Sequence, residues 1–276
     1  MYEQYWNLNE KPFENTPDPR FIYYSQKHEQ ALMRLLYAVK ETKGAGLLTG
    51  EYGSGKTLLS RILIDELIKS KIYEVALATN PALPPLQLIQ ELIYQLENTD
   101  IQGEKPVLLH HLQERIYHNF KAGKRTAIII DEAQLIEDQQ TFEELRLLLN
   151  FQLNNQFLIT LLLIGQPELI GKINQIPQLE QRMSIKFHLG PLDRAESSAY
   201  IAHRLSVAGR LKPIFTRKAE DLIYDYSQGI PRKINNACDI SLFIGSGACA
   251  ESIDKKIIED VIHDLTKQAP VYAQNV

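Results

Sequence analysis

The feature that most constrains this 276-residue chain is a glycine-rich loop between an expected strand and an expected helix. The apolar run 45–48 predicts a short buried strand, and the spacing of apolar residues in 58–64 predicts a helix. Between them the sequence follows the phosphate-binding pattern G-x-x-x-x-G-K-[ST] in the context that this pattern requires. The residues expected to bind a nucleotide are Gly50, Glu51, Tyr52, Gly53, Ser54, Gly55, Lys56, Thr57 and Leu58.

Each residue type in this loop has a chemical reason. Glycines allow positive φ and let the backbone approach a phosphate without a Cβ clash. The backbone N–H groups and the amino end of the following helix attract the anion. Lys56 would add a positive charge at the β- and γ-phosphates, and the Thr57 hydroxyl would bind Mg²⁺. The simpler interpretation is a strand-to-helix turn with an incidental Lys-Thr pair.

A pair of acids follows a second buried strand. The β-branched run 126–130 is typical of a strand covered on both faces, and Asp131 and Glu132 come directly after it. With a phosphate loop in the same chain, Asp131 is expected to join Thr57 around Mg²⁺. Glu132 would then orient and deprotonate the water that attacks ATP. The alternative is an exposed acidic turn that opens a helix.

The order of strands and helices predicts the fold class. Further strands are expected at 73–79, 158–164 and 184–189, with helical patterns between them. This alternation predicts an α/β fold of the P-loop NTPase type, a three-layer αβα arrangement around a parallel sheet. From Pro191 onward only helices are expected, at 194–208, 216–227, 231–246 and 254–266. The expected domains are an arm (1–24), an ATPase domain (25–190), a helical lid (191–267) and a loose tail (268–276).

The arm is rich in proline and aromatic residues, and we expect no regular helix in it. Its aromatic side chains must pack on something, because exposed they would favour aggregation. Two interpretations remain open: the arm covers a core, or it folds over the nucleotide base.

Composition narrows the class of protein. The 44% share of hydrophobic residues and the 23% share of charged residues are those of an ordinary globular protein. The net charge of −4 argues against a strongly nucleic-acid-coating protein but allows a local basic patch. Cys238 and Cys249 are expected to be reduced core residues. No signal peptide is expected, and the longest apolar run is too short to cross a bilayer. These features predict a soluble cytoplasmic protein.

Several motifs occur in the order found in AAA+ ATPases. They are 50–57, 128–132, Gly165-Gln166-Pro167-Glu168-Leu169, Arg182 and Gly229-Ile230-Pro231-Arg232. With Pro12-Phe13, the run 16–21 and Asp131-Glu132-Ala133-Gln134, the chain more narrowly resembles the ExeA/GspA group of secretion ATPases. This group includes the MshM-type proteins of pilus biogenesis. The resemblance covers residues 1–265 and implies an AAA+ type core with a helical lid.

The resemblance also implies roles for single residues. Gln166 would be the sensor-1 residue between the two acids and the γ-phosphate, or else a strand-end cap. Arg182 would be an arginine finger that reaches the γ-phosphate of a neighbouring subunit, or else a surface arginine. Arg232 would be the sensor-2 residue of the lid, or else part of a well-formed helix start after Pro231. Asn80, after the second strand, would restrain Glu132 until a partner binds.

The expected function follows from these parts. The chain would bind ATP and Mg²⁺ between its two domains, hydrolyse ATP and assemble with itself into a dimer or ring. ATP hydrolysis would drive or regulate assembly of a type II secretion or type IV pilus system. The larger secretion proteins of the group continue into a membrane span and a peptidoglycan-binding part. This chain stops after the lid, which favours a cytoplasmic protein, peripheral at the inner membrane if a membrane protein recruits it.

Two other functions remain open. One is a DNA-binding transposition regulator of the TnsC/TniB kind, for which Lys121, Lys124 and Arg125 offer a small basic cluster. The other is a nucleotide-gated scaffold with negligible turnover. An intact Glu132 and Arg182 argue against the scaffold, since a pure scaffold needs neither.

Overall fold

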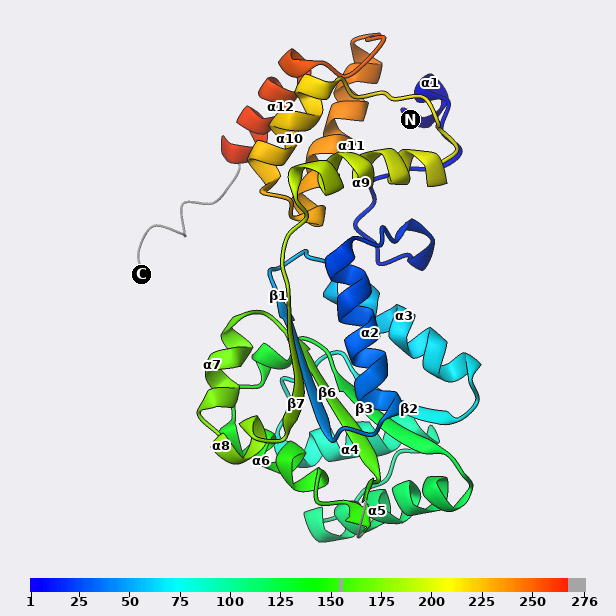
Figure 1. The fold of residues 1–276 in the computed structure, drawn as a ribbon, viewed down its shortest axis with the longest axis vertical. Helices are drawn as coiled ribbons and strands as arrows, with labels where there is room; N and C mark the ends of the chain where they lie inside the picture. The colour runs from blue at the N-terminus through cyan, green and yellow to red at the C-terminus, as the bar shows by residue number, and fades with distance from the viewer. Residues whose placement is uncertain (154–155, 268–276) are drawn as a thin grey trace. The chain divides into compact units, whose positions relative to one another are not determined.

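The computed structural model describes residues 1–153 and 156–267, which form two compact units (Figure 1). An α/β unit contains residues 26–52 and 56–189. A helical unit contains residues 1–25, the short loop segment 53–55 and residues 190–267. The loose tail expected at 268–276 lies outside the described residues.

The α/β unit is built on a five-stranded parallel sheet with the strand order β2-β3-β6-β1-β7. Its strands are β1 (Ala45–Gly50), β2 (Tyr73–Ala78), β3 (Arg125–Ile130), β6 (Ile159–Gly165) and β7 (Met183–Leu189). Every residue of β1 and β6 is buried, as expected for strands that are covered on both faces. The predicted α/β fold with a parallel sheet is confirmed.

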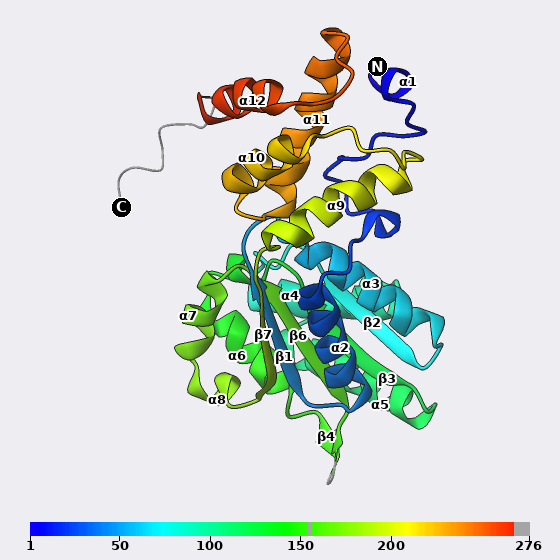
Figure 2. The same ribbon diagram turned by 45° about the horizontal axis from the view of Figure 1, so that its top comes forward.

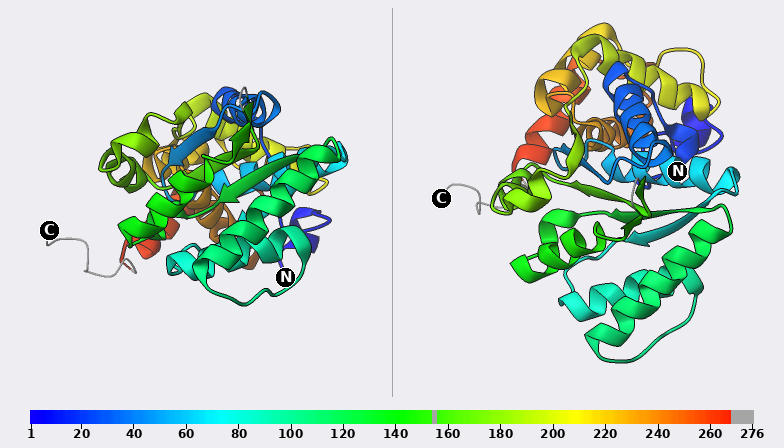
Figure 3. Two further views of the ribbon diagram at one scale, coloured as in Figure 1. Left: turned by 90° about the horizontal axis from the view of Figure 1, so that it is seen from below. Right: turned by 60° about the horizontal axis from the view of Figure 1, so that its bottom comes forward.

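Helices cover both faces of this sheet (Figures 2 and 3). One face carries α2 (Gln26–Lys40) and α3 (Lys56–Lys69), and the other carries α4 (Pro85–Glu97), α5 (Lys105–Lys121) and α6 (Gln139–Leu148). The short helices α7 (Glu168–Asn174) and α8 (Pro177–Glu180) share the hydrophobic core of this second face. Successive side chains of a strand point to opposite faces, so the residues of β1 pack alternately against the helices on the two faces of the sheet.

Parallel strands place their carboxyl ends at one edge of the sheet. The residues that follow β1, β3 and β6 therefore meet there, although they are far apart in the sequence. These are the glycine-rich loop, the acid pair and the segment that begins with Gln166. The topology thus assembles a site from three separate motifs.

Some short elements were not predicted. A small antiparallel hairpin joins β4 (Gln152–Leu153) to β5 (Gln156–Phe157). In the arm, a one-turn α-helix, α1 (Glu3–Trp6), precedes a 3₁₀ turn, η1 (Pro19–Phe21). The expectation of no regular helix in the arm is wrong for α1, because this turn forms before the first proline of the arm, Pro12.

The helical unit consists of α9 (Arg194–Val207), α10 (Arg217–Ser227), α11 (Pro231–Gly247) and α12 (Lys255–Lys267), with the arm packed into their core. Trp6, Phe13 and Phe21 are at most 5% exposed. The Trp6 indole N–H donates to the Leu242 carbonyl oxygen at 2.8 Å. The aromatic residues of the arm therefore complete a helical core, which favours the first of the two interpretations of the arm.

Arg204 of α9 ties the arm to the helices. Its buried guanidinium donates to the carbonyl oxygens of Pro12 and Glu14, the latter at 2.9 Å, and to the Tyr200 hydroxyl at 2.9 Å. It also lies over the Phe21 ring, 4.8 Å from the centroid. A buried cation with several acceptors and an aromatic face has its desolvation offset, so this arginine holds the arm in one position.

The two cysteines differ. Cys238 is buried in the helical core, as expected, and burial raises the pKa of its thiol. Cys249 is exposed, so its assignment to the core is wrong. It follows the end of α11 with a φ of 52°, in a turn where its side chain meets solvent.

Candidate nucleotide site

The glycine-rich loop links β1 to α3 and has the backbone that a phosphate site needs. Gly53 and Gly55 have φ values of 80° and 102°, a region that residues with a Cβ rarely adopt. Lys56, the first residue of α3, is only 5% exposed. Its ammonium donates to the carbonyl oxygens of Gly50 and Glu51 at 2.8 and 2.9 Å. A buried ammonium bonded to neutral carbonyl oxygens fits a site that receives an anion.

Thr57 and Asp131 are brought together. Asp131 is 3% exposed at the end of β3, and its carboxylate accepts hydrogen bonds from the Thr57 hydroxyl and from the Glu132 N–H, the latter at 2.9 Å. Burial raises the pKa of Asp131, and these two hydrogen bonds oppose the shift. A carboxylate beside a hydroxyl is a pair of oxygen ligands of the kind that Mg²⁺ accepts.

Glu132 and Gln166 are also brought together, but through a third residue. The Gln134 side chain donates from Nε2 to Glu132 Oε2 at 2.6 Å. Its Oε1 accepts the Gln166 backbone N–H at 3.0 Å. Gln166 lies directly after β6, so the two expected catalytic positions share one bridging amide.

The sequence alone predicts no role for Gln134. The residue stands in the Asp131-Glu132-Ala133-Gln134 motif, two positions after the acid. The short turn η2 (Ala133–Leu135) folds the chain back so that position 134 faces position 132, and no sequence pattern indicates this turn. The residue expected to restrain Glu132, Asn80, is exposed after β2, and no described side chain forms a hydrogen bond with it.

The remaining loop residues differ in exposure. Ser54 is buried, Leu58 is half-buried and Tyr52 is 59% exposed. The Tyr52 side chain, which belongs to the loop, is therefore largely exposed to solvent.

Arg182 lies directly before β7, at the amino ends of the strands and thus at the opposite end of the sheet from the glycine-rich loop. Its guanidinium donates to the Leu149 carbonyl oxygen at 2.9 Å and to Asn150 Oδ1 at 2.8 Å. In the β1–β7 register Ala45 pairs with Met183 and Gly50 pairs with Leu189. Arg182 is thus separated from the loop of its own chain by the length of β1, about 17 Å.

Arg232 is the second residue of α11, in the helical unit, and Pro231 occupies the first turn as expected. Its role as a sensor-2 residue stays a prediction.

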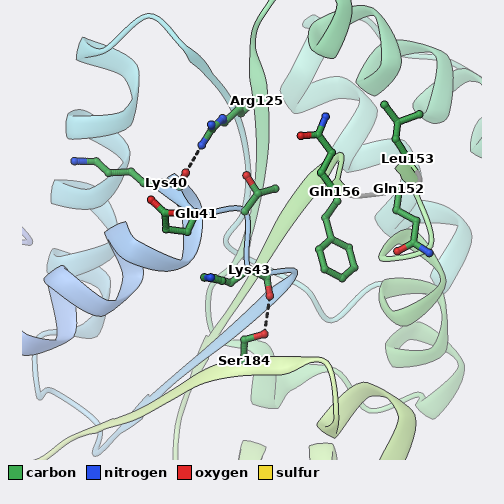
Figure 4. Close-up of a pocket in the computed structure, with 10 residues that line it drawn as sticks. Lys40, Glu41, Lys43, Arg125, Gln152, Leu153, Gln156 and Ser184 are labelled. Carbon is green, nitrogen blue, oxygen red and sulfur yellow. Dashed lines mark hydrogen bonds between the residues drawn. The ribbon is translucent and has the colours of Figure 1, made fainter.

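A pocket of about 860 Å³ lies at this same far edge, where the strands begin (Figure 4). It is lined by Lys40, Glu41, Thr42, Lys43, Arg125, Gln152, Leu153, Gln156, Phe157 and Ser184. Figure 4 shows the Arg125 guanidinium bonded to the Lys40 carbonyl oxygen and the Ser184 hydroxyl bonded to the Lys43 carbonyl oxygen. The pocket contains none of the expected nucleotide-site residues.

Comparison with known proteins decides the family of the site. A family model described as an AAA domain matches residues 39–173, which include the loop, the acid pair and Gln166. Residues 39–173 are an AAA domain. The chain is also 39% identical, over 246 residues, to general secretion pathway protein A from Aeromonas hydrophila. This match covers 88% of the chain but only 44% of the relative. The resemblance to AAA+ proteins and to the ExeA/GspA group is confirmed.

Solved structures agree on the fold of the AAA domain and its following helices. The Aeropyrum pernix ORC2 protein, in its ADPNP-ADP complexes, superposes with a TM-score of 0.69 at 18% identity. That match covers 93% of this chain and 72% of the other. The Thermotoga maritima RuvB Holliday junction branch migration motor gives a TM-score of 0.56 at 19% identity, over 86% and 69% of the two chains. At these identities the likeness establishes the fold alone.

One finding bears on the membrane. Among the helices of residues 1–153 and 156–267, none combines the length and the apolar character that a membrane span requires.

Proposed function

We propose that this AAA-domain chain binds ATP with Mg²⁺ and hydrolyses it. The observation that carries the proposal is that Lys56, Thr57, Asp131 and Glu132, from separate motifs, lie together at the carboxyl ends of the strands. Phosphoryl transfer needs positioned charge more than covalent chemistry, and this edge supplies it.

The residues divide the work. The loop 50–58 holds the phosphates through its backbone N–H groups, and Lys56 neutralises charge on the β- and γ-phosphates. Thr57 and Asp131 would hold Mg²⁺, which supplies further charge neutralisation when bound. Glu132 orients the attacking water and accepts its proton. Gln166 contacts the γ-phosphate as the sensor-1 residue.

Arg182 is proposed to complete the site of a second copy of the chain. The length of β1 separates it from its own loop, so it serves another subunit if it serves any. An arginine that stabilises transition-state charge in trans makes turnover depend on assembly into a dimer or ring. Arg232 is proposed to contact the nucleotide from the helical unit.

We propose that turnover drives or regulates assembly of a type II secretion or type IV pilus system at the inner membrane. The printed name of the Aeromonas hydrophila relative, general secretion pathway protein A, supports the secretion context. The chain spans less than half of that relative, so the membrane-protein partner and the location in the cytoplasm belong to the proposal.

The first test measures ATP turnover per subunit against protein concentration for wild type, Lys56→Ala and Arg182→Ala. We expect wild-type specific activity to rise with concentration. Lys56→Ala should lose activity, because the loop loses its phosphate-binding charge. In Arg182→Ala the turnover per subunit should fall by about 10³-fold or more, the effect typical of an arginine finger.

A mixing experiment separates a finger in trans from a structural role for Arg182. Glu132→Gln subunits keep the finger but lack the base, and Arg182→Ala subunits keep the base but lack the finger. Turnover restored by mixing two inactive variants supports the proposal. No restoration, with mixed assembly confirmed by co-purification of the untagged variant with an affinity-tagged one, would overturn the role of Arg182 and leave its bonds to Leu149 and Asn150 as its function.

The two other functions remain alternatives with their own tests. For DNA binding, the cluster expected at 121–125 is partly engaged, because Lys124 pairs with Glu74 at 2.5 Å and Arg125 bonds to a backbone carbonyl. Salt-sensitive binding of duplex DNA that Lys121→Glu and Lys124→Glu weaken would favour it. Nucleotide binding without turnover at any concentration would favour the scaffold.

A further inference from the structure

The acid that follows β3 has an unusual backbone. Glu132 has φ 53° and ψ 35°, the left-handed region that side chains rarely occupy. Such a conformation persists only where the surroundings hold it, and it often occurs at functional sites.

The Gln134 amide binds on both sides. Its Nε2 donates to Glu132 Oε2 at 2.6 Å, and its Oε1 accepts the Gln166 backbone N–H at 3.0 Å. A backbone N–H can only donate, so the amide oxygen must face Gln166 and the amide nitrogen must face Glu132. The orientation of this amide is therefore fixed by its partners.

The turn around Gln134 is fixed from behind. Lys172 of α7 donates to the carbonyl oxygens of Gln134 and Ile136 at 2.6 and 2.7 Å. Space for the amide exists because β6 ends in glycine: a Cβ on Gly165 would lie 2.6 Å from Gln134 Oε1. The amide thus fills the space above Gly165, in a turn that Lys172 holds in place.

From this geometry we infer that Gln134 is a positioning residue for Glu132, an inference that rests on the proposed ATPase function. It fastens one carboxylate oxygen and leaves the other to orient the attacking water. It also ties the carboxylate to the backbone of Gln166, the residue proposed to contact the γ-phosphate. The amide therefore links the base to the strand end that senses the nucleotide.

The experiment replaces Gln134 with Met, which keeps the length of the side chain but removes the donor and the acceptor. We expect kcat to fall about 10- to 100-fold, because a misplaced catalytic group loses most of its effect. KM and the affinity for ATP, measured with a fluorescent ATP analogue, should stay within about twofold. Gln139→Met, at an exposed position at the start of α6, is the matched control and should keep wild-type values.

A second variant separates the two hydrogen bonds. Gln134→Glu keeps an oxygen that accepts the Gln166 N–H but faces Glu132 with a carboxylate, so kcat should fall at least as far as in Gln134→Met. If Gln134→Glu retains wild-type kcat, the bond to Glu132 is not needed and the inference is wrong.

A double-mutant cycle tests whether Gln134 acts through Glu132. In a Glu132→Gln background, Gln134→Met should cause no further loss of the residual turnover, since residues that act as a unit are not additive. Additive losses would overturn the inference. If wild type binds ATP but never turns it over, the proposed function fails instead, which is a distinguishable result.

Discussion

At the scale of single residues, one missing side chain makes room for the site. Gly165 ends β6 with an ordinary backbone conformation, so its importance comes from space and not from its φ. A Cβ there would lie 2.6 Å from Gln134 Oε1, 2.9 Å from Leu169 Cδ2 and 3.3 Å from the Gln134 nitrogen. The backbone nitrogen cannot move aside as a flexible side-chain end can.

Gly165→Ala should therefore destabilise the α/β unit by about 1–3 kcal/mol, the cost typical of an overpacked site. Urea unfolding measures the change. Gly171→Ala is the control, because a Cβ at Gly171 of α7 meets nothing within 4 Å, and the helix should gain up to about 1 kcal/mol. Equal stability of the two variants would contradict the steric argument.

At the scale of elements, long periodic segments were predictable and short ones were not. The strand 126–130 and the helix 139–149 follow from apolar spacing alone. The turn η2 does not, because three residues carry no period, and its shape depends on Lys172 from α7. Of the candidate site, the residues that belong to sequence motifs, such as Lys56, Thr57 and Asp131, were predictable. The bridging role of Gln134 depends on a tertiary contact that no local pattern encodes.

The arm shows the same limit of sequence reasoning. Its prolines and aromatic residues indicated a packed segment, yet nothing in the sequence named the surface that it covers. The answer is the helical core, where the Trp6 indole is hydrogen-bonded to the Leu242 carbonyl oxygen of α11.

Trp6→Ala should cost the helical unit about 3–5 kcal/mol, as for other large aromatic truncations in a core. Labelling of the buried Cys238 by a thiol reagent reports the opening of this unit, and its rate should rise steeply. Tyr24→Ala, at an arm position that is 45% exposed, should leave the rate close to that of wild type. Labelling of the exposed Cys249 should be fast in all three proteins. An unchanged Cys238 rate in Trp6→Ala would show that the arm is dispensable to the core.

At the scale of the whole molecule, ligand binding should appear as stability. A nucleotide that binds only the folded AAA domain adds about 2.7 kcal/mol at a hundred times its dissociation constant. For a protein of this size the apparent melting temperature should rise by roughly 5–10 °C.

Removing the metal tests the expected Mg²⁺ ligands in the same assay. Chelation with EDTA should reduce the rise that ATP causes in wild type. Asp131→Asn should show the reduced rise with or without Mg²⁺, because the charged ligand is gone, and Lys56→Ala should show almost none. If EDTA lowers the rise in Asp131→Asn as much as in wild type, the metal is held elsewhere.

The partnership of the arm with the last helices has a consequence for synthesis on the ribosome. Residues 1–25 leave the ribosome well before the helices that cover their aromatic side chains, which begin only at Arg194. At an elongation rate of about 5–20 residues per second, the arm waits about ten seconds or more for α9 and longer for α11. During that interval the nascent chain displays Trp6, Phe13 and Phe21 to its surroundings while the sheet between them is made. Chaperone contact with a growing chain should therefore concentrate on residues 1–25.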